Sequence, residues 1–270
     1  MSDEPTKGTP SMISALQWST LFVCALVALF RTPSALRGEN RSLFGVFALA
    51  TFAVMLSIES NYTVIDAWLG SHNYANLLLR FVIYGTVLLA GYKIARGFGH
   101  PTTVPLLLGP VGLSVLAVIA LATIVPFLMA NTAGTSVGMA AIPDQSEDNR
   151  QLIRLYTAAG RLYPAYVAGC LLPATVGAMR SRLPGLVRSG AAVLSVGAAA
   201  MILLVFGELL PGPLVFLQYF ISSTAVLGLV AGLALIWLGR VAARRGSRNY
   251  PSLADAHRAP GQENIAAEEL

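Results

Sequence analysis

Long apolar stretches separated by short polar ones occur along most of the 270-residue chain. A helix needs about 20 apolar residues to cross a bilayer core, and seven stretches are of that order. They cover residues 11–30, 43–58, 75–94, 104–129, 152–179, 191–210 and 213–238. The pattern therefore predicts an all-α membrane protein with seven transmembrane helices.

The composition supports this prediction. Hydrophobic residues make up 55% of the chain and charged residues 11%, whereas about 25% of the residues in a soluble domain are charged. The chain is also too hydrophobic for intrinsic disorder. Its first residues, Met1–Glu4, lack the basic region of a signal peptide, so the first apolar stretch is expected to be a retained span.

Three parts are expected along the chain. Residues 1–10 form an extracellular tail, residues 11–239 the seven-helix transmembrane domain, and residues 240–270 a disordered cytoplasmic tail. The tail is basic at its start and acidic at its end. We expect its basic start to lie on anionic lipid headgroups.

Basic residues cluster after every second span. Those that follow the first, third, fifth and seventh spans are Arg31, Arg37, Arg41, Lys93, Arg96, Arg180, Arg182, Arg188, Arg240, Arg244, Arg245 and Arg248. Acidic residues dominate the other ends: Asp3, Glu4, Asp66, Asp144, Glu147 and Asp148. Because cytoplasmic loops carry the excess of Lys and Arg, we expect the amino terminus outside and the carboxyl terminus in the cytoplasm.

The types of basic residue also indicate the kind of organism the protein comes from. Sixteen of the 18 are Arg, and with abundant Ala and Gly this bias is typical of a GC-rich genome. We therefore expect the plasma (inner) membrane of an actinobacterial cell. The basic residues form no helix interleaved with aromatic residues, so nucleic acid is not an expected partner.

A short motif suggests an internal repeat. The pattern Arg-x-Pro-x-x-x-Arg occurs at residues 31–37 and again 151 residues later at residues 182–188. Glu59 and Glu208 lie near the ends of the spans that follow. This predicts two parallel three-helix repeats joined by the fourth span, as in some transporters. The alternative is that Arg- and Pro-rich cytoplasmic turns match by chance.

The connection from Asn131 to Arg150 is the longest on the outer side and is rich in Gly, Ser, Thr and Asp. Short polar residues without hydrophobic periodicity are typical of a solvated loop. We expect a solvated connection here, with a mobile lid as the alternative.

Ionisable residues inside spans cost about 2.5–3.5 kcal/mol each at the helix centre, which makes them candidates for function. Arg154 and Arg161 are seven residues apart and share a helix face; Arg161 lies about 10 Å deeper. We expect an outward-facing polar pocket among the second, third, fifth and sixth spans. Its candidate ligand-binding residues are Arg161, Arg154, Arg80, Glu59, Glu208 and Tyr163.

Two hypotheses for these residues stay open. Three Arg against two Glu leave one positive charge, which suits a small anionic solute bound for transport or sensing. Alternatively, Arg80 pairs with Glu59 and Arg161 with Glu208, and the pairs only fix helix packing. The protein would then be a non-catalytic membrane interaction protein.

The sequence lacks the motifs of common catalytic, metal-binding and nucleotide-binding sites. It has no Gly-x-Ser-x-Gly, no His-Glu-x-x-His and no Walker lysine. Cys24 and Cys170 lie within apolar stretches, and the three histidines are scattered. We therefore expect no catalytic residues, no metal and no cofactor, and do not expect an enzyme.

Gly228 and Gly232 in the last span form a Gly-x-x-x-Gly motif. Such motifs let membrane helices pack closely, either within one chain or between two copies. The expected partners are thus the lipid bilayer, a small anionic solute, and a membrane-protein partner or second copy.

Three short segments carry a resemblance. They are Arg-x-Pro after the first span, Asp66-x-x-x-Gly70-x-x-Asn73 between the second and third, and Leu-Val-Arg-Ser-Gly at the start of the sixth. Over about residues 30–210 the chain resembles actinobacterial seven-helix integral membrane proteins, which are described as transporters or left uncharacterised. Longer members carry a soluble carboxyl-terminal domain that is absent here. The resemblance implies the membrane fold and transfers no functional residue.

Overall fold

The computed structural model describes residues 9–38, 41–98, 102–139, 142–144, 146–181, 183–209 and 215–248. Within these ranges the chain is helical, with turns and loops between the helices and no strand. The α-helices are α1 (Thr9–Leu36), α2 (Arg41–Ser57), α3 (Glu59–Trp68), α4 (Tyr74–Phe98), α5 (Thr103–Leu108), α6 (Pro110–Met129), α7 (Glu147–Arg180), α8 (Gly185–Leu203) and α9 (Val215–Arg248). Two short 3₁₀ helices are η1 (Val137–Met139) and η2 (Leu204–Leu209). The expected tails at 1–8 and beyond Arg248 lie outside the described residues.

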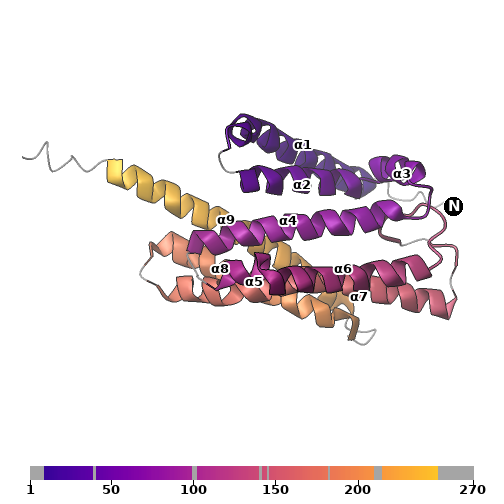
Figure 1. Ribbon diagram of the computed structural model, residues 1–270. Helices are drawn as coiled ribbons and strands as arrows, with labels where there is room; N and C mark the ends of the chain where they lie inside the picture. Colours follow the sequence, from indigo (N-terminus) through magenta and orange to yellow (C-terminus); the bar gives the residue numbers. More distant parts are fainter. Residues whose placement is uncertain are drawn as a thin grey trace, which may run out of the picture.

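The long helices lie side by side, with α4 and α7 at the centre (Figure 1). α4 packs against α2 on one side and against α7 on the other, and α1 packs on α2. α7 also contacts α6 and α8, and α9 packs on α8. The short helix α3 lies at one end of this bundle, which we call the α3 end (Figure 1).

Several of these helices fit a bilayer. α4, α6, α7 and the segment Gly185–Gly207 are long and apolar enough to cross a membrane. α2 and α3 pass the same test together, although a bend of 92° separates them. The described residues therefore hold four or five candidate spans, in an all-helical chain that suits a membrane. The count of seven and the orientation stay predictions.

One predicted span is broken, which corrects the sequence analysis, whereas the predicted stretch 43–58 agrees with α2. The stretch 43–58 ends at Ser57, and Ile58 has an extended backbone that turns the chain into α3. The stretch 104–129 is divided into α5 and α6 at Gly109, which is also extended. Gly109 precedes Pro110, and a residue before proline is driven out of the helical region. Apolar composition alone does not reveal the break at Gly109.

Other boundaries shift without a change of order. α1 continues through Pro33 to Leu36, so Arg31 is helical rather than part of a turn. α7 begins at Glu147, five residues before the predicted start, because Ser146 caps it by accepting a hydrogen bond from the Asn149 N–H. α9 runs on to Arg248 instead of ending near residue 238.

The repeat stays a prediction. In each half the middle helix packs against both neighbours, since α2 contacts α1 and α4 while α8 contacts α7 and α9. The two matching prolines differ in their setting, however. Pro33 lies inside α1, whereas Pro184 is the N-cap of α8.

Glycines bring α8 and α9 into close contact. A Cβ added to Gly197 of α8 would lie 2.8 Å from the Leu229 nitrogen of α9. One added to Gly232 of α9 would lie 2.8 Å from the Leu194 nitrogen of α8. Real Cβ atoms do not approach a backbone this closely. The Gly228-x-x-x-Gly232 motif thus serves packing within the chain.

This packing predicts a difference between glycines. Gly197→Leu and Gly232→Leu should each lower the apparent melting temperature in lipid nanodiscs, because overpacking costs about 1–3 kcal/mol. The control is Gly169→Leu on α7, where an added Cβ meets nothing within 4 Å. Equal melting temperatures for all three variants would contradict the close α8–α9 contact.

Candidate functional site

Asp66 of α3 joins three parts of the chain at the α3 end. Its side chain is fully buried, and its carboxylate accepts hydrogen bonds from the N–H groups of Asn73 and Ala75, both at 3.1 Å. These donors lie at the amino end of α4, where a helix has free N–H groups and favours negative charge. The Thr135 hydroxyl also donates to Asp66, at 2.9 Å. Asp66 therefore ties α3 and the loop after α6 to the start of α4.

Asn73 completes this junction. Its amide nitrogen donates to the carbonyl oxygens of Thr132 and Gly134, and its amide oxygen accepts from the Tyr62 hydroxyl at 2.8 Å and the Ser136 N–H at 3.0 Å. Asn73 has a φ of +59°, a left-handed conformation that asparagine tolerates better than most residues. Both donors and both acceptor sites of the amide are therefore used. Asp66 and Asn73 together are called the latch below.

The far end of the same loop has its own anchor. The buried Asn149 of α7 donates to the carbonyl oxygens of Asn131 and Asp144, and its amide oxygen accepts from the Asn131 N–H. Hydrogen bonds from Ser146, first its backbone N–H and then its hydroxyl, lower the pKa of Asp144. The loop between α6 and α7 is thus bound at both ends.

Apolar residues of this loop close the α3 end. Met139 and Ile142 are buried and pack with Phe127 of α6 and Tyr156 of α7. Most described residues of this connection are exposed or half-buried, as the prediction of a solvated connection requires, but the buried Met139 and Ile142 also anchor it to the helices. Buried asparagines and two apolar side chains hold it over the helices, which makes it a cover.

Arg80 lies beneath this cover. It is the seventh residue of α4, about 9 Å from the start of the helix, and its side chain is half-buried. Its guanidinium carbon lies 5.4 Å from the centroid of the Tyr156 ring, a cation–π distance. A Cβ at Gly160 of α7 would lie 2.9 Å from the same carbon, so a larger residue there would have to displace the Arg80 guanidinium.

The predicted Arg80–Glu59 pair is absent from the described side chains. Glu59 is exposed at the first residue of α3, and the 92° bend after α2 carries it away from α4. Arg80 forms no ion pair with a described carboxylate. Among the described side chains, its charge therefore faces tyrosines, Tyr156 and Tyr84, rather than a carboxylate.

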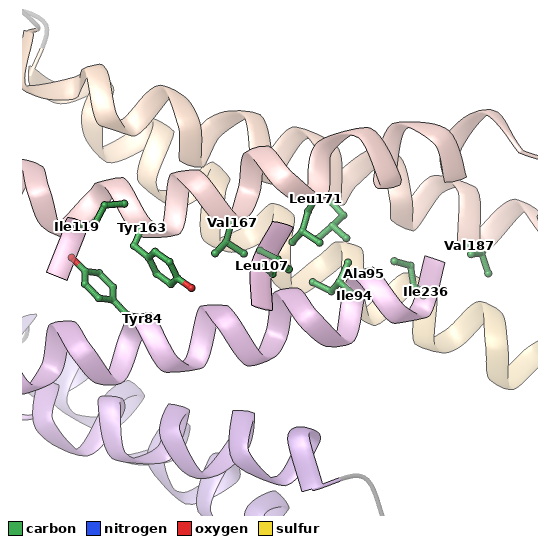
Figure 2. Packing of buried hydrophobic residues seen from close by; sticks show 11 residues of the cluster. Tyr84, Ile94, Ala95, Leu107, Ile119, Tyr163, Val167, Leu171, Val187 and Ile236 are labelled. Atoms are coloured by element: carbon green, nitrogen blue, oxygen red, sulfur yellow. The ribbon is translucent and has the colours of Figure 1, made fainter. Parts of the chain in front are cut away.

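Two more tyrosines, Tyr84 and Tyr163, lie further along α4 and α7 from the α3 end than Arg80 and Tyr156. The Tyr84 hydroxyl lies 2.9 Å from the Thr123 hydroxyl, and its ring centroid lies 5.2 Å from that of Tyr163. Figure 2 shows these two rings facing each other from α4 and α7. The hydroxyls of Tyr156 and Tyr163 are buried and have no hydrogen-bond partner of good geometry among the described residues. A buried hydroxyl without a partner costs free energy, and for Tyr156 the Arg80 side chain lies close enough to interact with it.

The remaining predicted site residues are spread out. Arg154 is exposed and pairs at 2.7 Å with Glu147, which also pairs with Arg150 at 3.0 Å. Arg161 follows Gly160 directly and is half-buried. The predicted Arg161–Glu208 pair lies outside the described residues, because the Glu208 side chain is not among them. The structure thus brings Tyr156 to Arg80 and Tyr163 to Tyr84, and it separates Arg154 and Glu59 from Arg80.

A cavity of about 90 Å³ lies further inward, between α4, α7, α8 and α9. Its lining includes Gly91, Pro164, Val167 and Gly197 and is almost entirely apolar. Figure 2 shows Val167 and Leu171 continuing the apolar packing on from Tyr163. This cavity does not match the expected polar pocket. The candidate site is therefore the group of Arg80, Tyr84, Tyr156 and Tyr163 under the cover.

Comparison with known proteins adds no relative. No protein-family model, curated protein or solved structure matches the chain.

From the sequence, Tyr156 is one of several tyrosines that could supply a hydroxyl, but a tyrosine near the end of a span is usually an interfacial residue, so it is not among the predicted site residues. Asp66 stands out only as an acidic residue between spans and, with Asn73, as part of a resemblance. Their bonds to each other and to the loop are not predicted. A usable indication exists for Asn73, because an asparagine directly before a helix start is typical of a capping residue.

The latch predicts a local effect on the cover. Asn73→Gly keeps the left-handed backbone accessible but removes four hydrogen bonds. Lost hydrogen bonds of buried groups cost about 1–3 kcal/mol, so amide exchange over residues 131–139 should accelerate roughly 5- to 150-fold.

The matched control is Ser71→Gly, at an exposed residue with a similar φ of +57°. It should leave the exchange of this loop unchanged. Equal acceleration in both variants would mean that backbone freedom, and not the Asn73 side chain, governs the loop.

Proposed function

We propose that the protein is a polytopic plasma-membrane protein that binds a small anionic solute at Arg80, for transport or sensing. The observation that carries this proposal is a half-buried guanidinium in a candidate membrane span that has no carboxylate partner among the described side chains. A charge in that position is costly unless it is compensated. An anionic ligand supplies the compensation that Glu59 does not.

The neighbouring groups fit the same ligand. Tyr156 lies beside Arg80, and a hydroxyl next to a guanidinium is a suitable donor to a carboxylate or phosphate. The Tyr163 hydroxyl, buried further along α7, has no hydrogen-bond partner among the described residues. Arg161, one residue beyond Gly160, is a further cation on α7. Arg154 is less suited to this role, because Glu147 already neutralises it.

The proposal includes seven spans with the α3 end outside. α1 begins at the α3 end and α9 ends at the opposite end (Figure 1), which supports an odd number of crossings. Arg37, Arg96 and Arg180 lie at ends of helices remote from α3, whereas Asp144 and Glu147 lie at the α3 end. This distribution follows the positive-inside rule.

The second candidate is a non-catalytic interaction protein. The observation in its favour is the close contact of the Arg80 guanidinium with Gly160 and the Tyr156 ring. In this case the arginine would only fix how α4 packs on α7. The two candidates differ in what the loss of Arg80 does.

Arg80→Gln should remove a bound solute while the protein stays folded. Loss of a charge-assisted hydrogen bond costs about 1.5–3 kcal/mol, or roughly 10- to 150-fold in affinity. Native mass spectrometry of the protein in lipid nanodiscs measures the occupancy directly. Arg154→Gln, at an exposed and paired arginine, is the control and should keep the solute.

If neither the wild type nor Arg80→Gln carries a solute and the variant is only less stable, solute binding is contradicted. That result would favour the interaction protein. Retention of the solute by Arg80→Gln would also contradict the proposal, since the site would then lie elsewhere.

A further inference from the structure

α3 lies across the end of the bundle rather than along it. Its axis turns by 92° from that of α2, and Figure 1 shows it at the level where α2 ends and α4 begins. Ser57, the last residue of α2, and Tyr74, the first of α4, mark the same ends of two neighbouring apolar helices. A helix at right angles to spans, at the level of their ends, lies in the plane of the membrane surface.

The two faces of α3 have different surroundings. Tyr62 and Asp66 are fully buried on one face. The Tyr62 hydroxyl donates to Asn73, and Asp66 accepts from the Thr135 hydroxyl. Val64 and Trp68 are four residues apart and therefore share another face. That face is exposed: 58% of Val64 and 90% of Trp68 are accessible. The latch fixes the rotation of the helix, so the fold itself holds this apolar face outward.

We propose that the Val64–Trp68 face of α3 docks into the lipid headgroup layer at the α3 end. Tryptophan is enriched at this depth because its ring is apolar while its N–H needs a polar partner. A short amphipathic helix in the surface plane buries its apolar face at the boundary of headgroups and acyl chains.

The charges on α3 indicate which lipid headgroups it can bind. The helix contains no Lys or Arg, and Glu59 is exposed. Attraction to anionic headgroups is therefore not the cause of docking, and zwitterionic lipid suffices. The inference rests on the fold and not on the proposed solute site, so each can fail without the other.

The test follows the fluorescence of Trp68 alone. Trp18→Phe and Trp237→Phe leave it as the only tryptophan of the chain, and the protein is reconstituted into phosphatidylcholine vesicles. Lipids brominated close to the headgroup should quench Trp68 at least twofold more than lipids brominated near the bilayer centre. Aqueous acrylamide should quench it several-fold less than free tryptophan.

A control chain retains only Trp18 of α1 and carries Trp68→Phe and Trp237→Phe, so it reports whether reconstitution left α1 in the bilayer. Strong quenching of Trp68 by acrylamide with none by brominated lipid would overturn the inference, because the face would then lie in water. Shielding from both quenchers would overturn it too, since a protein surface would then cover the face.

Discussion

The buried carboxylate of Asp66 is the interaction on which the α3 end depends. It accepts three hydrogen bonds, two from the start of α4 and one from the loop after α6. A buried carboxylate without donors would be very costly. These three segments must therefore meet at one place for the chain to fold. Asn73 extends the junction to the loop backbone.

The rest of the bundle follows from packing in a medium without water. Between apolar helices lipid gives little hydrophobic driving force, so close contact and satisfied backbone groups decide the arrangement. Glycines supply that contact between α8 and α9. Between α4 and α7, the absence of a side chain at Gly160 leaves space that the Arg80 guanidinium occupies. The same residue type thus packs one pair of helices and leaves room for a charge in the other.

The sequence predicts the order and type of the helices because apolar length reports membrane crossing directly. It does not predict α3, because a ten-residue segment with buried Tyr62 and Asp66 reads as an ordinary polar connection. Nor does it predict the cover, since the bond between Asp66 and Thr135 joins residues 69 apart in the chain. The pairing of Arg80 with Glu59 was inferred from charge alone, and the bend after Ser57 separates them.

The central proposal is that Arg80 is reached from the α3 end, which the proposed topology places outside, under a cover that the latch holds. Ala159 is buried beside Gly160, so Ala159→Cys in a Cys24→Ser, Cys170→Ser background reports access to this site. A membrane-impermeant maleimide is applied to intact cells. Slow labelling that Asn73→Gly accelerates severalfold is the predicted result. Labelling only after the membrane is permeabilised, or labelling unaffected by Asn73→Gly, would contradict the claim.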